Sequence, residues 1–421
     1  NLDGADLLRA ILMTRAAKEK YHGTSATSEV REFRIRMGME LDLMNLWFGK
    51  TADYFKQFIS DQTIGMARIN RFDFTTLPIN LLYLLYYEYR RNEKESLNFS
   101  FFEYGKNSNG NPDDDRWEMY LELQEMYAIL QRWYNDKELY HYLGFLFFNF
   151  KAQTPFRDIY TQWKALNSRD KFLKDIQHTI ATRMLDRYLE ETEKAAPDYQ
   201  KCLKTMTEAI SDFRENWYNN DKELYQILIL LDIFRILDSK SIKKLPTDYF
   251  TRKSGQKDGE DKEHILSQTP RKDNGEIATI KTDWEKFAQS EDFKDIRSQM
   301  QDILNHSDAE LTEQELIQLQ NLLNSAGLNS IGNMVLLDLR INRSYGNADY
   351  AHKRTIIFQE YMNQKYVRPH TLAVFMKGDI DAREATGIPL NRWTLEDIKR
   401  NTDKIAKEIG KNFNAWLTQN N

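Results

Sequence analysis

The stretch Glu263-His264-Ile265-Leu266-Ser267-Gln268, taken with the segment IGNMVLLDLRINRSYGNADYAHK at 331–353, predicts the fold of the C-terminal part of the chain. The first stretch is a short apolar run with an acid and an imidazole as neighbours, and on a strand neighbouring side chains point to opposite faces. The second reads as a strand, MVLLDL, then a polar loop of Asn, Ser and Gly, then the start of a helix. Together they predict two strands and a helix, with histidine, asparagine and carboxylate side chains at the junctions.

These side chains are of the types that hydrolyse a phosphodiester. The reaction needs a base that takes a proton from water and a cation that neutralises charge on the phosphate and the leaving oxygen. An imidazole with a pKa of about 6.5 suits the first task. A divalent ion held by carboxylate, amide or imidazole ligands suits the second. The pattern therefore predicts a nuclease that uses one metal ion.

Three motifs carry a resemblance to a known family. They are E-H-I-x-x-Q at 263–268, I-G-N-x-x-L-L at 331–337 and N-x-S-x-x-N-x-x-Y-x-x-K at 342–353. They resemble the C-terminal HNH-type nuclease domain of GmrSD-type, modification-dependent (Type IV) restriction enzymes and their phage-defence relatives. The resemblance covers roughly residues 260 to 420, because VRPHTLAVFMKG at 367–378 and RWTLEDIKRNTDKIAKEI at 392–409 are similar to closing segments of that domain.

In those proteins a ParB-like nucleotide-hydrolysing domain and a helical region precede the nuclease. Residues 1–20, NLDGADLLRAILMTRAAKEK, resemble the stretch that follows the ParB-like core. We therefore expect the ParB-like domain to be missing from this chain, and with it any nucleotide cofactor.

The resemblance implies roles for individual residues. It implies His264 as the general base, Glu263 as a metal ligand together with His264, and Asn342 as a later ligand or orienting amide. Lys353, one turn into the helix, is implied to contact the scissile phosphate or steady the transition state as a point charge. The implied cofactor is Mg²⁺ or Mn²⁺, and the implied substrate is DNA, including modified phage DNA.

Other polar residues near the motifs are expected to support the site. Asn333 is expected to tie the I-G-N turn together through its amide, Ser344 to bond loop backbone or phosphate, and Asn347 to cap the helix. The basic residues that we expect to contact DNA are Lys243, Lys244, Arg252, Lys253, Arg343 and Arg354.

The sequence departs from the family pattern in its spacing. His264 and Asn333 are too far apart for a compact two-strand motif, so residues 270–328 are expected to be an insertion. It reads as a polar loop followed by helices, with Thr312 and Glu315 as a capping box and Gly327 as a C-cap. The histidine usual at the final ligand position on the helix is not evident, which leaves the metal shell incomplete.

The first half of the chain reads as successive amphipathic helices. In one of them, at 30–48, apolar residues recur at Ile35, Met39, Leu43 and Leu46. A break at 105–115, GKNSNGNPDDD, predicts a solvated loop. Helices are expected to continue to about residue 238, so the predicted architecture is a helical domain at 1–238, a basic linker at 239–259 and an α+β nuclease domain of ββα type at 260–421.

Two readings of the basic segment stay open. Between 240 and 257 there are six basic residues and one acid, interleaved with Tyr249 and Phe250. Such a segment can hold a phosphate backbone and stack a base. The alternative is a solvated interdomain linker, which SGQKDG at 254–259 supports.

Composition sets the outer limits. The chain of 421 residues has 41% hydrophobic and 13% aromatic residues, ample for two or three cores. One cysteine excludes a disulfide framework and suits a reducing cytoplasm, and no segment has the length and apolarity of a membrane span. The net charge of −5 excludes a protein that coats nucleic acid indiscriminately.

A second class of function stays open beside the nuclease. The net acidity and the incomplete metal shell also fit a catalytically degenerate nuclease fold that binds DNA or a regulatory protein and cuts nothing. The helical half is also a candidate for a homo-oligomerisation scaffold.

Overall fold

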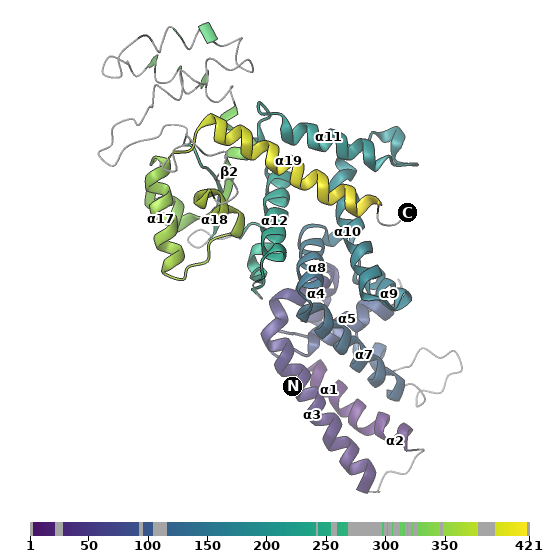
Figure 1. Ribbon diagram of the computed structural model, residues 1–421. Coiled ribbons are helices and arrows are strands. Elements are labelled where there is room, and N and C mark those ends of the chain that lie inside the picture. Colours follow the sequence, from purple (N-terminus) through teal and green to yellow (C-terminus); the bar gives the residue numbers. More distant parts are fainter. Residues whose placement is uncertain are drawn as a thin grey trace. The chain divides into compact units, whose positions relative to one another are not determined.

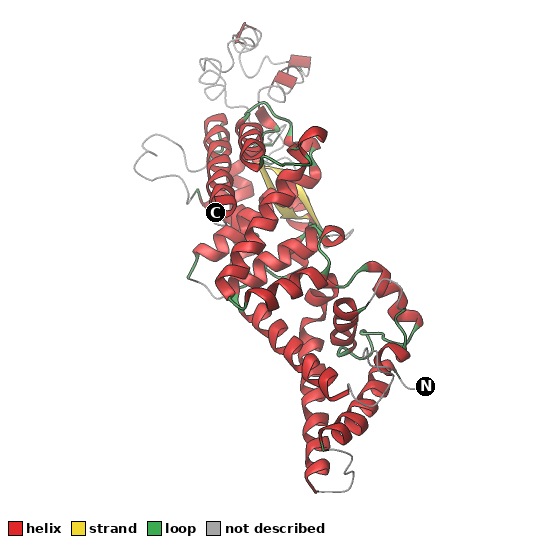
Figure 2. Cartoon of the chain, turned by 90° about the vertical axis from the view of Figure 1, so that its right-hand side faces the viewer, coloured by secondary structure: helices red, strands yellow, loops and turns green. Residues whose placement is uncertain are grey.

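The computed structural model describes residues 3–21, 28–91, 96–103, 116–240, 243–253, 259–267, 327–345, 348–377 and 392–418, with scattered positions between 297 and 322. The chain divides into two compact units, Asn1–Ile176 and Gln177–Asn421, which we call unit 1 and unit 2 and describe separately. Both are mainly helical, and one small sheet lies in unit 2 (Figures 1 and 2), so the predicted fold class is confirmed. Among the described helices, none has both the length and the apolar character needed to span a bilayer.

Unit 1 is a set of helices around an aromatic core. Tyr54 stacks on Tyr140 with ring centroids 4.6 Å apart, and Phe58 stacks on Phe147 at 3.8 Å. Buried aromatic pairs of this kind add to the area-based gain from burial. The elements of the unit are α1 (Gly4–Ile11), η1 (Leu12–Ala16), α2 (Ala17–Lys20), α3 (Ser28–Phe55), η2 (Lys56–Phe58), α4 (Asp61–Ile69), α5 (Asn80–Arg90), α6 (Phe99–Glu103), α7 (Arg116–Asn135), α8 (Lys137–Asn149), η3 (Lys151–Gln153), α9 (Phe156–Leu166) and the first part of α10 (Arg169–Leu185).

Helix α3 buries a different face from the one that the sequence predicted. The helix itself is confirmed, but the predicted apolar face is largely exposed. The hydrophobic side chains that α3 buries are Val30, Phe33, Met37, Leu41, Met44, Phe48, Tyr54 and Phe55. Because α3 carries apolar residues on both sides, helical periodicity predicts the helix and cannot tell which side meets the core.

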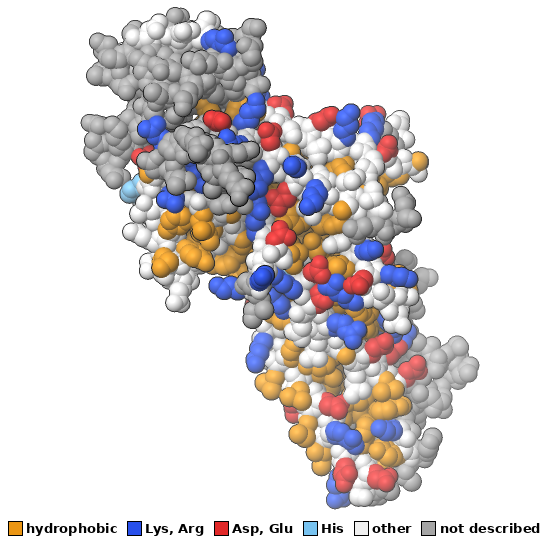
Figure 3. Space-filling model, in the orientation of Figure 1, with side chains coloured by type: hydrophobic (Ala, Val, Ile, Leu, Met, Phe, Trp, Pro, Cys, Tyr) orange, Lys and Arg blue, Asp and Glu red, His pale blue; other side chains and the backbone are white. Residues whose placement is uncertain are grey.

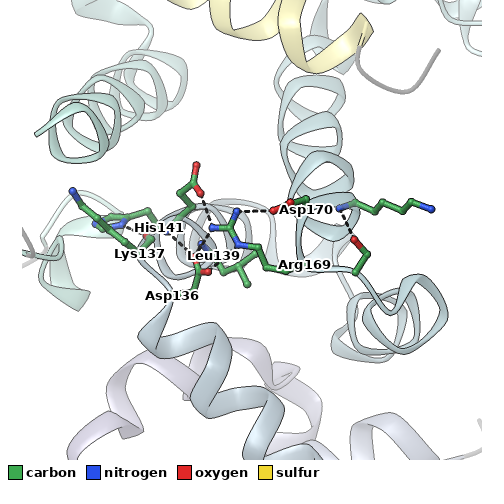
Figure 4. Close-up of polar contacts among 9 residues, drawn as sticks. Asp136, Lys137, Leu139, His141, Arg169 and Asp170 are labelled. Atoms are coloured by element: carbon green, nitrogen blue, oxygen red, sulfur yellow. Dashed lines mark hydrogen bonds and ion pairs between the residues drawn. The ribbon is translucent and has the colours of Figure 1, made fainter. Parts of the chain in front are cut away.

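The N-terminus of α8 shows how local sequence sets a helix boundary in unit 1 (Figure 4). The Asp136 carboxylate accepts hydrogen bonds from the backbone N–H groups of Glu138 and Leu139, both at 3.0 Å, as an N-cap. Arg169, the first residue of α10, donates to both Asp136 oxygens at 2.9 Å. Burial opposes ionisation of Asp136, but these donors outweigh it and hold the pKa of the carboxyl below its usual value.

Unit 2 surrounds a two-stranded antiparallel sheet with helices. Strand β1 (Glu260–His264) pairs with β2 (Met334–Asp338) in a register that sets Glu260 opposite Asp338 and His264 opposite Met334. The two predicted strands are thus confirmed and lie side by side. The other elements are the end of α10, η4 (Asp186–Tyr188), η5 (Glu191–Glu193), α11 (Tyr199–Ser211), η6 (Trp217–Asn219), α12 (Asp221–Asp238), η7 (Thr247–Phe250), η10 (Ile331–Asn333), α16 (Leu339–Tyr345), α17 (Tyr350–Met362), α18 (Pro369–Met376) and α19 (Leu395–Thr418).

Helices α11 and α12, which the sequence placed in a domain ending at residue 238, belong to unit 2. Helix α11 packs along α19, and α12 packs against α18 and β2. Nearly every side chain of α12 is buried, which explains its almost continuous run of apolar residues. In the segment predicted as a linker, Leu245, Tyr249 and Phe250 are buried, so its described part packs through these three side chains while Lys243 stays exposed.

The turn before β2 lies directly against α19. Gly332 donates its backbone N–H to the Thr402 hydroxyl at 3.2 Å, and Asn401 donates to the Gly332 carbonyl at 2.8 Å. A Cβ at position 332 would lie 2.3 Å from the Ile398 carbonyl oxygen, closer than atoms can approach. The glycine of the I-G-N motif is therefore required by the close approach of η10 and α19.

Little of the predicted insertion is described. Thr312 and Glu315 make the reciprocal hydrogen bonds of the predicted capping box. Gly327 has a φ of +107°, a conformation that favours glycine, and the residues directly before it lie outside the described part of the chain. The predicted loop at 105–115 lies outside the described residues.

Candidate functional site

His264 is the last residue of β1, and its imidazole is buried. The residue is 8% exposed, and its ring stacks on the ring of Tyr218 with centroids 4.9 Å apart and planes 14° apart. The Nε2 atom of His264 lies 2.9 Å from Oδ1 of Asn329. The imidazole is therefore fixed by an aromatic face on one side and an amide at its edge.

These contacts set the protonation state of His264. An amide oxygen only accepts hydrogen bonds, so Nε2 carries the proton and Nδ1 keeps its lone pair. Burial lowers the pKa of the imidazole to about 4; the bond to Asn329 opposes this, and the charges of Lys353 and Lys262 add to it. The imidazole is consequently neutral at pH 7, and Nδ1 is the nitrogen that can accept a proton.

Glu263 points to the opposite side of β1, where it meets Lys353 of α17. The Lys353 ammonium donates to Oε1 of Glu263 at 2.8 Å and to the backbone carbonyl of His264 at 2.6 Å. The lysine is fully buried, and burial lowers its pKa while Glu263 opposes the shift. Lys353 therefore ties α17 to the end of β1, next to the residue that carries the imidazole.

Asn333 joins the segment after β1 to the turn before β2. Its side-chain oxygen accepts from the Leu266 N–H at 2.8 Å, and its side-chain nitrogen donates to the carbonyls of Leu266 and Leu328 at 3.1 and 2.9 Å. The residue is fully buried. These three bonds satisfy backbone groups that the two short strands leave unpaired.

A buried ion cluster anchors the other end of β1. Arg368 binds both carboxylate oxygens of Glu260 at 2.7 and 2.8 Å and Asp232 of α12 at 2.8 Å. Two carboxylates share one guanidinium, and burial raises the pKa of Asp232 to about 6. Since all three side chains are almost fully buried, the cluster fixes β1 against α12 and the start of α18.

The prediction of a polar loop directly after β2 is wrong. Residues 339–345 form helix α16, so Asn342, half-buried, lies in a helix and not in a loop. Asp338, at the end of β2, accepts from the Arg340 N–H at 2.8 Å, which favours a helix start directly after the strand. Arg343 and Ser344 also lie in α16, and Asn347 lies outside the described residues.

The basic residues predicted to contact DNA differ in their surroundings. Arg252 donates to the Glu260 carbonyl at 2.8 Å and pairs with Asp261, and Arg354 donates to the Phe375 carbonyl at 3.0 Å. Lys253 lies over the Tyr249 ring. Lys243 is exposed and Lys244 half-buried. The two arginines thus hold backbone in place.

Sequence reasoning missed two residues that contact His264. Asn329 lies two residues after Gly327, which has a positive φ, and the Asn329 carbonyl accepts from the Trp217 N–H at 3.0 Å, which holds η6 beside it. Tyr218 comes from η6, far from β1 in sequence. An Asn just before the I-G-N motif was a weak signal for the first residue, while the position of Tyr218 carried none.

The described side chains match a divalent cation only in part. Glu263 supplies a hard carboxylate oxygen of the kind that Mg²⁺ and Mn²⁺ prefer, but it also binds Lys353. His264 lies on the other side of the strand. Within the described residues, no three His, Cys, Asp or Glu side chains come together as a ligand cluster.

Comparison with known proteins agrees with the motif resemblance. Residues 207–408 match the family model described as GmrSD restriction endonucleases, C-terminal domain. The matched span begins in α11, contains both strands and ends in α19, so it includes His264 together with Tyr218 and Asn329. Neither a curated protein nor a solved structure matches the chain.

Proposed function

We propose, from the match of residues 207–408 to the GmrSD C-terminal domain family, that unit 2 is a DNA endonuclease of a restriction or phage-defence protein, working in the cytoplasm. The observation that carries the proposal is the neutral imidazole of His264, whose Nε2 is engaged by Asn329 and whose Nδ1 is the proton acceptor. Modified DNA is the substrate class we propose, and HNH-type chemistry is the reaction.

In this proposal each residue of the site has a defined task. His264 takes a proton from the attacking water at Nδ1, and Asn329 and Tyr218 hold the ring so that this nitrogen keeps one direction. Lys353 is buried on Glu263 and the His264 carbonyl. Its task is therefore to position the end of β1, in place of the contact with the phosphate that the resemblance implied.

We also propose a requirement for Mg²⁺ or Mn²⁺, with Glu263 as the carboxylate ligand and Asn342 as the candidate amide. When bound, such an ion neutralises charge on the phosphate and the leaving oxygen. EDTA should then abolish cleavage, and added Mn²⁺ should restore it.

The central test is nicking of supercoiled plasmid by the full chain. We expect His264→Asn to lower the cleavage rate by about a hundredfold to ten-thousandfold, the contribution typical of a general base. His178→Asn, a histidine of α10 outside the site, is the matched control and should cut like the wild type. Cleavage by His264→Asn at the wild-type rate would remove the proposed base.

A second variant keeps the test informative if His264→Asn unfolds the protein. Asn329→Ala retains the imidazole and removes the bond at Nε2. We expect it to lower kcat while KM stays within about twofold, because the base would lose its orientation and not its contact with DNA. Thermal unfolding of each variant separates loss of function from loss of fold.

One observation favours a second candidate, a degenerate fold that binds and does not cut. Lys353 occupies the carboxylate of Glu263, and Tyr218 covers the imidazole of His264. A binding module would give a salt-sensitive gel shift with no nicked plasmid at any Mn²⁺ concentration. Nicking that His264→Asn removes would exclude it.

A further inference from the structure

Helix α3 presents a continuous apolar stripe away from the core of unit 1. Ile35, Met39, Leu43 and Leu46 are 58%, 62%, 61% and 64% exposed. They follow one another at intervals of four, four and three residues, which places all four on one side of a helix. Figure 3 shows hydrophobic surface along the edge of unit 1 where Figure 1 draws α3. Single exposed apolar residues are ordinary, whereas a contiguous stripe is typical of a surface that another chain covers.

The charges at the two ends of the stripe indicate what covers it. Glu32 lies three residues before Ile35, and Lys50 lies four residues after Leu46, so both share the face of the stripe, and both are exposed. Glu32 is nine residues before Leu41 and Lys50 is nine residues after it. Glu32 and Lys50 are thus opposite charges placed symmetrically about the centre of the stripe. The exposed Arg36 borders the stripe beside Ile35 and Met39, and Asp53, one turn beyond Lys50, is paired with Lys56.

This charge pattern is complementary to itself in one orientation. If a second α3 packs antiparallel with its centre at Leu41, Glu32 faces the partner's Lys50, and the same pair forms again at the other end. Met39 and Leu43, each two residues from the centre, face the partner's Leu43 and Met39. A parallel arrangement would instead set Glu32 against its own copy, which repels.

We propose that the stripe Ile35–Met39–Leu43–Leu46 is a self-association surface, at which α3 pairs antiparallel with α3 of a second copy of this chain. From Glu32 to Lys50 the helix is roughly 27 Å long at about 1.5 Å per residue. One helix–helix seam of this length falls at the small end of specific interfaces, so we expect a dissociation constant on the order of micromolar. The proposal does not depend on nuclease activity.

Sedimentation velocity of the full chain across a roughly hundredfold concentration range tests it. We expect the wild type to shift from monomer to dimer, and Met39→Lys or Leu43→Glu to stay monomeric. Ile69→Lys, at a residue of α4 that is 81% exposed and lies off the stripe, is the matched control and should dimerise normally. Glu32→Lys or Lys50→Glu should each weaken the dimer several-fold, and the double variant Glu32→Lys/Lys50→Glu should restore it.

Cross-linking tests the orientation independently. Cys202 is buried, so cysteines introduced on α3 report without interference. A mixture of Met39→Cys and Leu43→Cys proteins should form disulfide-linked dimers faster than either protein does separately, because the antiparallel pairing brings 39 opposite 43. A wild type that stays monomeric at the highest concentration, a dimer that survives Met39→Lys, or a double charge swap that restores nothing would each overturn the proposal. If the wild type is monomeric and Met39→Lys unfolds it, the stripe must be covered by another part of the same chain. That result would also overturn the proposal.

Discussion

At the scale of single residues, the burial of His264 determines its chemistry. An ordinary histidine has a pKa of about 6.5 and is partly charged at neutral pH. His264 lies between Tyr218 and Asn329 with a pKa of about 4, so it is neutral from about pH 5 upward. Because its pKa is low, the His264 imidazole is unprotonated at neutral pH and can always accept a proton. The same low pKa makes it a weaker base, so each proton transfer is less favourable.

Removing the Tyr218 ring, which covers the imidazole of His264, should raise the pKa of that imidazole. Tyr218→Ala opens the imidazole to water, so we expect the pKa of His264 to rise from about 4 toward the ordinary value of about 6.5. Proton NMR titration of the imidazole Cε1–H signal, assigned by its absence in His264→Asn, measures the shift. Because the variant would become protonated as the pH falls below about 6.5, its cleavage rate should decline at a higher pH than that of the wild type.

The control for this titration is Tyr361→Ala, at an exposed tyrosine of α17. It should leave the pKa of His264 unchanged. If the signal of His264 titrates at the same pH in wild type and Tyr218→Ala, then the tyrosine does not keep water from the ring, and the low pKa has another cause.

For this site, the sequence predicted which residues are present better than it predicted which residues they contact. The sequence identified Glu263, His264 and Lys353, and the structure places all three at the junction of β1 and α17. It could not show that Lys353 is bonded to Glu263, because that bond joins segments 90 residues apart. Nor could it find Tyr218, since a tyrosine in a short helical turn has no pattern that marks what it stacks on. The roles assigned to these residues stay predictions.

At the scale of elements, the close approach of η10 and α19 can be tested by substituting the glycine of the I-G-N turn. Gly332→Ala places a Cβ 2.3 Å from a backbone oxygen of α19, which only a shift of one element can relieve. We expect a loss of about 2 kcal/mol or more in the free energy of unfolding. Urea unfolding followed by circular dichroism measures the change.

Gly65→Ala is the matched control for that substitution. Nothing lies within 4 Å of the Cβ it introduces in α4, so it should be neutral or stabilise by up to about 1 kcal/mol. Equal unfolding midpoints for Gly332→Ala and wild type would mean that η10 and α19 are not in close contact.

A second test concerns the N-cap of α8, whose contribution to stability should depend on pH. Asp136→Asn keeps the capping oxygen and removes the charge that faces Arg169, so at pH 7 we expect it to cost about 1 kcal/mol. The folded pKa of Asp136 is below its unfolded value, so its contribution is full above about pH 4 and is lost as the pH falls through the folded pKa. The difference in unfolding midpoint between wild type and Asp136→Asn should therefore shrink on acidification. A difference that grows toward low pH would show that the charge does not stabilise the helix.

Element types were easier to predict from the sequence than the faces they bury. The strands at 260–264 and 334–338 and most helices of both units follow from apolar periodicity and caps. Two errors have the same origin. In α3 both faces are apolar, so the pattern could not select the buried one, and at 339–345 polar residues suggested a loop where a helix packs Ile341 into the core of unit 2. In each case tertiary contacts decided what local sequence left open.

At the scale of the whole molecule, the net charge of −5 limits how the protein can approach DNA. An acidic chain is repelled by the phosphate backbone at long range, so binding must come from a few local cations that release counterions. Of the predicted contacts, Lys243 and Lys244 lie just before η7, in the packed segment that leads to β1. They are the residues at which the predicted DNA contact is best tested.

Salt dependence separates a local contact from the effect of total charge. Lys243→Gln/Lys244→Gln takes the net charge from −5 to −7 and removes two proposed phosphate contacts, so the slope of log affinity against log salt should become less steep by roughly two. Lys201→Gln/Lys204→Gln makes the same change of net charge on α11, at two exposed lysines. It should weaken binding modestly at low salt and leave the slope as it is, because no contact is lost. Fluorescence anisotropy with a short duplex at several salt concentrations measures both slopes. If the two double variants change the slope equally, the protein senses DNA through its overall charge, and the segment before β1 makes no specific contact with the backbone.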